Sequence, residues 1–308
     1  MKFFFYLVLH SVIISLFYQE NAYSQKLSTS SISDKNPKEK IIWLVEDKKE
    51  NIDLLAKKTP DTSTASYIES SVISQLTQYD VELSRGSMTR AIHYLKTKDN
   101  VCVANRFNLP ERREYSIFSN PQSFYISHKL YRYNQSTPLP KLLFNTNGEI
   151  KSIPAVFKAL PQSTIGAAQA VSFGPFLDKQ IEQLDAKNVY YRGGTNRVTA
   201  LEAMLYKDRI QLLLALPFDV NPTSEQSPLL EQYTIEGNPP YSIAHINCSD
   251  SELGHKVIKD INKILASMYK TSDYYLAHRK WFPENELEEL QRFLKDNFSN
   301  DEYITPNQ

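Results

Sequence analysis

Residues 40–46, KIIWLVE, form an almost unbroken apolar run near the start of the chain. Such a run is typical of a central parallel strand that is buried on both faces of its sheet. A helix is predicted around residues 68–76, a strand in YDVELSRGS, a helix in MTRAIHYLKTK and a third strand in NVCVAN. The second of these helices is indicated by Met88, Ile92 and Leu95, which recur at helical spacing. This alternation predicts a doubly wound α/β unit.

A second unit with a similar alternation follows an extended stretch over residues 116–133 that is rich in Phe and Tyr. Its strands are predicted in STIGAAQA, KNVYYRGG and IQLLLALP, with one helix that starts near Gly174-Pro175 and another in TNRVTALEAMLYKDR. PYSIAHINCS is extended again. The helix after it carries a capping-box pattern, with Ser249 as the expected N-cap and Glu252 as its partner.

The first 24 residues have the features of a secretory signal peptide. Lys2 gives a charged start, residues 3–17 are mostly apolar, and residues 22–24 have the small-x-small pattern of a cleavage site. The alternative is an uncleaved membrane anchor, but this apolar run is shorter than the roughly 20 residues that cross a bilayer. We expect cleavage near Ser24 and a flexible start over residues 25–39. No cysteine near the cleavage site could carry a lipid anchor, so the protein would stay with its cell only inside an outer membrane. We therefore expect a location in the periplasm.

Composition limits the classes of partner and site. The 35 basic and 35 acidic residues balance, and the signal peptide removes one of each, Lys2 and Glu20, so the mature chain stays neutral. A nucleic-acid partner would need a basic face and is not expected. The 8 glycines argue against a glycine-rich phosphate loop. The two cysteines, Cys102 and Cys248, leave two alternatives open, a disulfide or two buried thiols.

Motifs of catalysis are missing from the sequence. It has no GxSxG, HExxH, CxxC or P-loop pattern, and its histidines are scattered without the spacing of a metal cluster. We therefore expect a protein that is not an enzyme and that uses no metal and no cofactor. A secreted hydrolase is the least favoured alternative.

Three segments carry a resemblance to a known family: VCVANRFNLPERREYSIFSNP, LYKDRIQLLLAL, and the stretch from YSIAHINCSDSELGHK to Lys280-Trp281. In this order they resemble the type II periplasmic solute-binding proteins, in particular the amino-acid-type branch called solute-binding family three. The pattern is nearer to an uncharacterised subgroup than to a classical transport receptor. The likeness covers roughly residues 40–283.

The resemblance implies an α/β fold of two lobes, each a mixed sheet flanked by helices, joined by two hinge strands. Lobe one would comprise residues 40–121 plus 245–308, and lobe two residues 122–244. A ligand would bind in the cleft, and the lobes would close by hinge bending. In the family the third strand and the returning hinge strand are neighbours, which favours a disulfide between Cys102 and Cys248.

The same resemblance points to ligand-binding residues. In the family an arginine on the turn after the third strand grips the ligand's carboxylate, and Arg112 takes that position here. Asn105 and Phe107 on the same turn are further candidates. This chain departs from the family in lacking hydroxyl residues before the arginine, and in having Gln211 where an acid often binds the ligand's amino group. Both departures weaken a specificity for α-amino acids. The alternative for Arg112 is an ion pair on a solvated turn.

Topology adds four candidates, because ligands of open α/β units bind beyond the carboxyl ends of strands. Glu46 and Asp47 end the first strand, although a solvated turn is an equal alternative. Ser172 and Phe173 precede a helix start, where backbone N–H groups suit an anion. Phe173 has packing in the core as its alternative.

These features predict an extracytoplasmic protein that captures a small polar solute, an amino acid or a related carboxylate, between two lobes. The solute would be handed to an inner-membrane permease of the ABC type. The alternative is a sensor of the same fold that signals through a membrane partner. We expect a monomer.

Overall fold

The structure is a computed structural model of the chain. It describes residues 37–46, 51–56, 58, 63–194, 196–217, 219–220, 229–282, 284 and 287–298. The predicted signal peptide, the start of the chain up to residue 36, and Asp47 lie outside these ranges. The described residues from Lys40 onward belong to one compact unit. Within the described ranges, no helix has both the length and the apolar character needed to cross a membrane.

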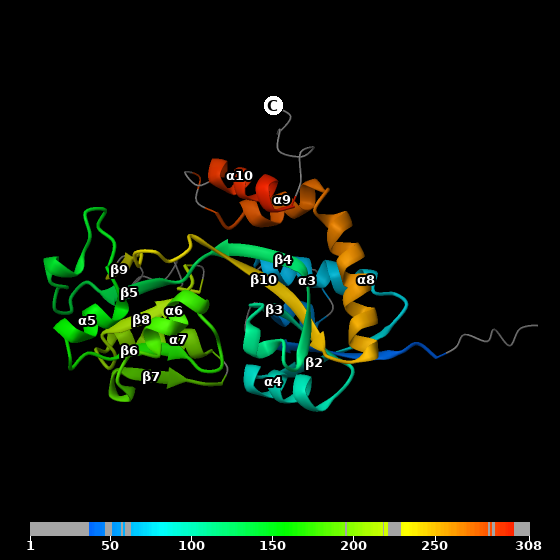
Figure 1. Cartoon of the computed structure of the whole chain (residues 1–308), viewed down its shortest axis with the longest axis horizontal. Helices are drawn as coiled ribbons and strands as arrows, with labels where there is room; N and C mark the ends of the chain where they lie inside the picture. The colour runs from blue at the N-terminus through cyan, green and yellow to red at the C-terminus, as the bar shows by residue number, and fades with distance from the viewer. Residues whose placement is uncertain are drawn as a thin grey trace, which may run out of the picture. The chain divides into compact units, whose positions relative to one another are not determined.

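The first sheet has five strands in the order β2-β1-β3-β10-β4. β1 (Lys40–Glu46) is parallel to β2 (Asp80–Gly86) and β3 (Val101–Arg106). β10 (Tyr241–Ser249) is antiparallel both to β3 and to β4 (Ser116–Ile126). Figure 1 shows the long strands β4 and β10 side by side. The sheet is therefore mixed, with strands from both ends of the described chain.

Apolar side chains cover both faces of this sheet, as the run in residues 40–46 predicts. Trp43 packs on the face with α3 (Thr64–Gln75) and α8 (Glu252–Met268), whereas its neighbour Leu44 packs on the face with α4 (Met88–Thr97). Because side chains alternate along a strand, β1 has to be apolar at nearly every position. Three further helices belong to this part: α2 (Ile52–Leu55), α9 (Ser272–Arg279) and α10 (Leu287–Phe298).

The second sheet also has five strands, in the order β7-β6-β8-β5-β9. β6 (Ile165–Ala168) is parallel to β7 (Val189–Arg192) and to β8 (Leu212–Ala215). β5 (Lys129–Tyr133) is antiparallel to β8 and to β9 (Leu230–Tyr233). This sheet is also mixed, and it is made from the middle of the chain.

Helices cover both faces of the second sheet as well (Figure 1). Leu212 faces a core shared with α5 (Ile153–Ala159) and α6 (Pro175–Ile181). Leu213 faces the opposite core, shared with α7 (Arg197–Tyr206). The two sheets, each with helices on both sides, confirm the predicted mixed α/β architecture. The lobe boundaries at residues 121 and 245 stay a prediction.

The predicted N-cap of α8 is wrong. The cap is Ser251, whose side chain accepts a hydrogen bond from the backbone N–H of Gly254 over 2.9 Å. Ser249, the expected cap, is still the last residue of β10 and pairs with Ser116 of β4. The strand therefore continues further than the local sequence pattern indicates, and the helix begins two residues later.

Cys102 and Cys248 form a disulfide with a Cα–Cα distance of 4.0 Å. The two residues are direct partners in the antiparallel pairing of β3 with β10. This is the arrangement that the family resemblance favours, and the alternative of two buried thiols is excluded. The bridge joins positions 146 residues apart in sequence.

Candidate ligand-binding site

A cavity lies where residues of the two sheets meet. Residues at the carboxyl ends of β1 and β3 in the first sheet, and of β6 and β8 in the second, line it. This is the place where open α/β units bind their ligands. The cavity has a volume of about 70 Å³, several times the space that one water molecule needs.

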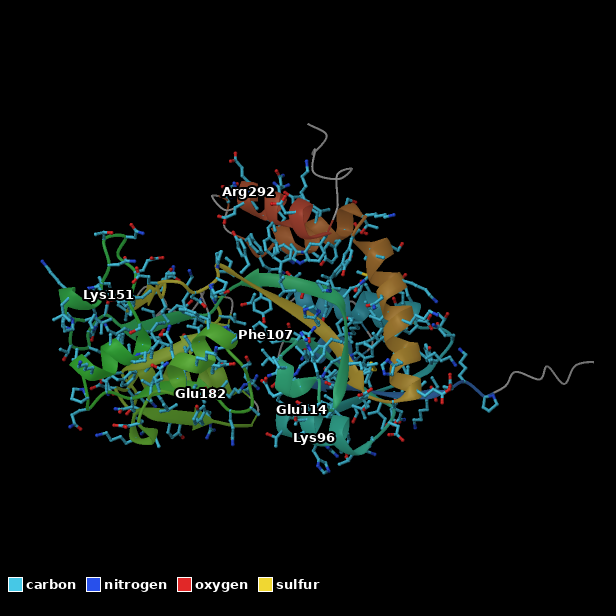
Figure 2. The ribbon with its side chains drawn as sticks, in the orientation of Figure 1. Lys96, Phe107, Glu114, Lys151, Glu182 and Arg292 are labelled. Atoms are coloured by element: carbon cyan, nitrogen blue, oxygen red, sulfur yellow. A yellow bond between two sulfur atoms is a disulfide. The ribbon has the colours of Figure 1, made fainter. Side chains whose placement is uncertain are left out.

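Six of the seven predicted ligand-binding residues line this cavity, although they are far apart in sequence. They are Glu46, Asn105, Phe107, Arg112, Ser172 and Phe173. The seventh, Asp47, lies outside the described residues. Figure 2 shows the side chains, with Phe107 labelled on the segment that follows β3. Contact of these residues with a ligand stays a prediction.

Arg106, the last residue of β3, is 4% exposed and lines the cavity. Asn105 before it has a φ of 58°, in the left-handed region that asparagine tolerates, and its N–H donates to the Gln122 side chain over 2.8 Å. Arg106 Nη1 donates to the sulfur of Met88, and Nε has no hydrogen-bond partner among the described residues. Burial, with a smaller effect from Arg112, lowers the pKa of Arg106 to about 9, which leaves it charged at neutral pH.

Arg112 ends a short 3₁₀ turn, Pro110–Arg112, and is also buried. Its Nη1 donates to the carbonyl oxygen of Phe107 over 3.1 Å, and burial lowers its pKa. Arg113 beside it is exposed, does not line the cavity, and donates through Nε to Asn108 over 2.7 Å. The turn thus directs the first arginine inward and the second outward. The solvated-turn alternative applies to Arg113 and not to Arg112.

Glu46 forms an ion pair with Arg197, the first residue of α7. Both side chains are largely buried, at 12% and 8% exposure, so Glu46 is not on a solvated turn. Asn196 before Arg197 has a φ of 52°. An asparagine in the left-handed region therefore precedes a cavity arginine twice, once at the end of the first sheet's β3 and once at the start of α7 beside the second sheet. Such backbone conformations cluster at functional sites.

The turn before α6 differs from the sequence-based expectation. The backbone N–H of Phe173 donates to Asp178 over 2.8 Å, and that of Gly174 donates to the hydroxyl of Ser172 over 3.0 Å. The Ser172 hydroxyl in turn donates to Asp178. These N–H groups are therefore used within the turn and are not open to an anion. The ring of Phe173 is 5% exposed and packs edge-on against His128 at 5.0 Å between centroids.

Among the described lining residues, basic side chains outnumber acidic ones. Arg106, Arg112 and Arg197 line the cavity together with two acids, Glu46 and Asp219, which leaves positive charge in excess. The buried Asn105 Oδ1 has no hydrogen-bond partner within the described ranges and can accept one from a ligand donor. No group of three or more His, Cys, Asp or Glu residues in the described ranges is arranged to hold a metal ion.

Sequence reasoning did not select Arg106 and Arg197 as site residues. Their local signal is the dipeptide Asn-Arg, which occurs in ANRF and in TNRV, each time at the edge of a predicted element. Gln211, at the position where the family often has an acid, accepts a hydrogen bond from the N–H of Thr164 over 2.9 Å and does not line the cavity.

Comparison with known proteins identifies the fold. No family model matches the chain, and no curated protein matches its sequence. Among solved structures, it is similar to a mutant arginine-binding protein from T. maritima, with a TM-score of 0.56 and 14% identity over 79% of this chain and 95% of that one. A histidine kinase sensor domain with similarity to periplasmic binding proteins gives a TM-score of 0.56 and 9% identity, over 80% and 98% of the two chains. The substrate-binding protein of an amino acid ABC transporter gives 0.55 and 13%, over 79% and 99%.

These similarities define a class of fold. The chain has the two-lobed α/β fold of the type II periplasmic binding proteins, as the resemblance in sequence predicts. The similar structures named above are binding proteins or a sensor domain. At these identities the likeness concerns the fold, and the chemistry of the site has to be argued from its own residues.

Proposed function

We propose that this protein is an extracytoplasmic solute-binding protein that captures a small anionic solute between its two lobes. The observation that carries this proposal is the cavity with two buried arginines, Arg106 and Arg112, neither of which has a carboxylate partner among the described residues. A carboxylate matches the two-pronged donor geometry of a guanidinium group. An amino acid or a related carboxylate therefore suits the site better than an uncharged sugar.

The proposed mechanism is closure of the two lobes around the solute. Lobe one, residues 40–121 plus 245–308, would contribute Arg112, Asn105, Phe107 and Glu46. Lobe two, residues 122–244, would contribute Ser172 and Phe173. A ligand that contacts residues of both lobes binds the closed state better than the open one, and this difference in affinity favours closure.

The described lining residues that could take part in hydrolysis have other contacts. His128 packs against Phe173, the Ser172 hydroxyl donates to Asp178, and Glu46 pairs with Arg197. These contacts favour a binding function over the secreted hydrolase.

Two roles are open to the protein once it has bound its solute. The first candidate is delivery of the solute to an ABC permease, and the second is signalling through a membrane partner. The similarity to an ABC transporter's binding protein supports uptake, and the similarity to a histidine kinase sensor domain supports sensing. Uptake of the identified solute by cells with and without this gene separates the two. Loss of uptake on deletion supports the permease; unchanged uptake with a lost transcriptional response supports the sensor.

The experiment for binding itself is a thermal-shift screen of the mature protein against amino acids, small carboxylates, polyamines and sugars. A ligand well above its Kd should raise Tm by a few degrees. We expect hits among the carboxylates, and we expect Arg112→Ala to abolish the shift because it removes a buried anion partner. Arg113→Ala is the matched control and should keep the shift. An Arg112→Ala variant that responds like the wild type would refute the site.

A further inference from the structure

Two buried guanidinium groups face one cavity. Arg106 and Arg112 are 4% and 7% exposed, and the charge of Arg112 acts to lower the pKa of Arg106. Like charges enclosed together repel each other, and low polarity around them strengthens the repulsion. A single monoanion between them would neutralise only half of this charge.

Among the described residues, three acids attract the two arginines, and none of them forms an ion pair with either. Glu46 attracts Arg106, but its ion pair is with Arg197. Glu111 attracts Arg112 from an exposed position on the same turn. Asp178 also attracts Arg112, but its oxygens accept hydrogen bonds from the Ser172 hydroxyl and the Phe173 N–H. Among the described residues, neither arginine therefore has a carboxylate of its own.

Arg106 is an additional charge relative to the family pattern on which the resemblance rests. In that pattern one arginine, at the position of Arg112, grips a carboxylate. Here Arg106, the last residue of β3, lies in the stretch before Arg112 where the family has residues that help bind the same carboxylate. Its Nε is buried without a hydrogen-bond partner in the described part of the chain. The side chain is thus an enclosed, partly unsatisfied donor beside the expected ligand position.

We propose that the site is selective for a small dianion, with Arg112 and Arg106 sharing its two negative charges. This inference rests on the proposed function and specifies its class of solute. The cavity of about 70 Å³ suits a compact solute such as a short dicarboxylate or an inorganic dianion. Asn105, with its free Oδ1, would accept from an amino group if the dicarboxylate carries one.

The test compares ligands that differ by one charge and little else. Isothermal titration measures Kd for succinate against its half-amide succinamate, and for aspartate against asparagine, at fixed ionic strength. In the wild-type protein we expect a dianion to bind about tenfold or more tightly than its amide. A difference in affinity of this size corresponds to the free energy of one hydrogen bond to a charged group. Sulfate forms a third arm, which distinguishes an inorganic dianion from a dicarboxylate.

A variant assigns the preference to one residue. Arg106→Met has a side chain of similar length without charge, and it should reduce the dianion preference to about threefold or less while the amides still bind. Arg113→Met is the control and should keep the full preference. The wild-type comparison needs no variant, so it decides the proposal even if Arg106→Met fails to fold.

The outcomes separate this inference from the function on which it rests. Equal affinity for dianions and their half-amides overturns the dianion site and leaves solute binding in place. An Arg106→Met protein that folds and keeps the preference overturns the assignment to Arg106. No binding by any of these ligands at millimolar concentration overturns both proposals.

Discussion

Enclosing a guanidinium group removes the water that solvates it, and proteins usually offset this cost with a carboxylate. Arg197 follows this pattern, because it is buried and pairs with Glu46. Arg106 is equally enclosed, yet its described contact is a donation to the sulfur of Met88. Its charge therefore lowers the stability of the ligand-free protein. A bound ligand that supplies a negative charge would offset this cost.

This reasoning predicts that Arg106→Met stabilises the ligand-free protein. Removing a buried charge without an ion-pair partner should raise the free energy of unfolding by about 1–3 kcal/mol. Urea denaturation in chloride buffer, without dianions, measures the change. Arg113 is exposed, so Arg113→Met should change the free energy of unfolding by less than about 0.5 kcal/mol. A less stable Arg106→Met protein would show that the arginine is structurally supported in the fold.

At the scale of elements, β1 and α3 are joined by a buried polar contact. The indole Nε1–H of Trp43 donates to the carboxyl oxygen Oε1 of Glu69 over 2.7 Å. Burial raises the pKa of Glu69 to about 7, and the hydrogen bond from Trp43 opposes this rise only in part. The fold is therefore most stable when Glu69 is protonated, because the effect of burial outweighs that of the Trp43 hydrogen bond, which favours the ionised form.

Glu69→Gln should make the protein more stable in alkaline solution and leave it nearly unchanged in acid. A folded pKa of about 7 against 4.5 in the unfolded chain means that stability is fully present below pH 4.5 and is lost as pH rises through 7. The variant keeps the acceptor for Trp43 but cannot ionise, so at pH 8 it should gain about 3 kcal/mol at most. Guanidinium denaturation at pH 5 and pH 8 measures this, and equal effects at both values would contradict it.

His278 on α9 has the opposite dependence and must be separated from Glu69. Burial lowers the pKa of His278 to about 4, while its Nδ1 lies 2.7 Å from the carbonyl oxygen of Tyr274 and its ring stacks on Phe124. Its contribution is present above pH 6.5 and is lost as pH falls through 4. In the wild type the two groups partly cancel. The Glu69→Gln protein should therefore lose stability between pH 6.5 and 4 more steeply.

Most elements could be predicted from sequence because their signals are local. The strand pattern of residues 40–46 and the helical spacing in α4 depend on neighbours a few positions away. The start of α8 could not be placed, because it depends on how far β10 stays paired with β4. That pairing involves residues more than a hundred positions apart, as Ser249 with Ser116 shows.

At the scale of the whole molecule, the disulfide ties β3 to β10. Replacing both Cys102 and Cys248 with Ala should lower the free energy of unfolding by up to about 5 kcal/mol, the loop-closure estimate for a separation of 146 residues. Calorimetry of the variant and of the reduced wild type measures the loss. Equal melting temperatures for the oxidised and reduced wild type would contradict it.

The candidate site was predictable only in part, because some of its contacts join residues that are remote in sequence. Topological rules place the ends of β1 and the turn before α6 in the cleft region, and the family pattern selects Arg112. The role of Arg106 depends on which acids come near it in three dimensions, and the one that attracts it, Glu46, is remote in sequence. The pairing of Glu46 with Arg197 likewise has no local signal.

The bridge between Cys102 and Cys248 also encloses every strand of the second sheet within a single covalent ring of the polypeptide. A protease that cuts once inside this ring produces two fragments that remain linked until a reductant is added. The half of the molecule that contains the second sheet can then be cut at its surface without being released. In an environment rich in proteases, such a molecule keeps both walls of its cavity attached after the first cut.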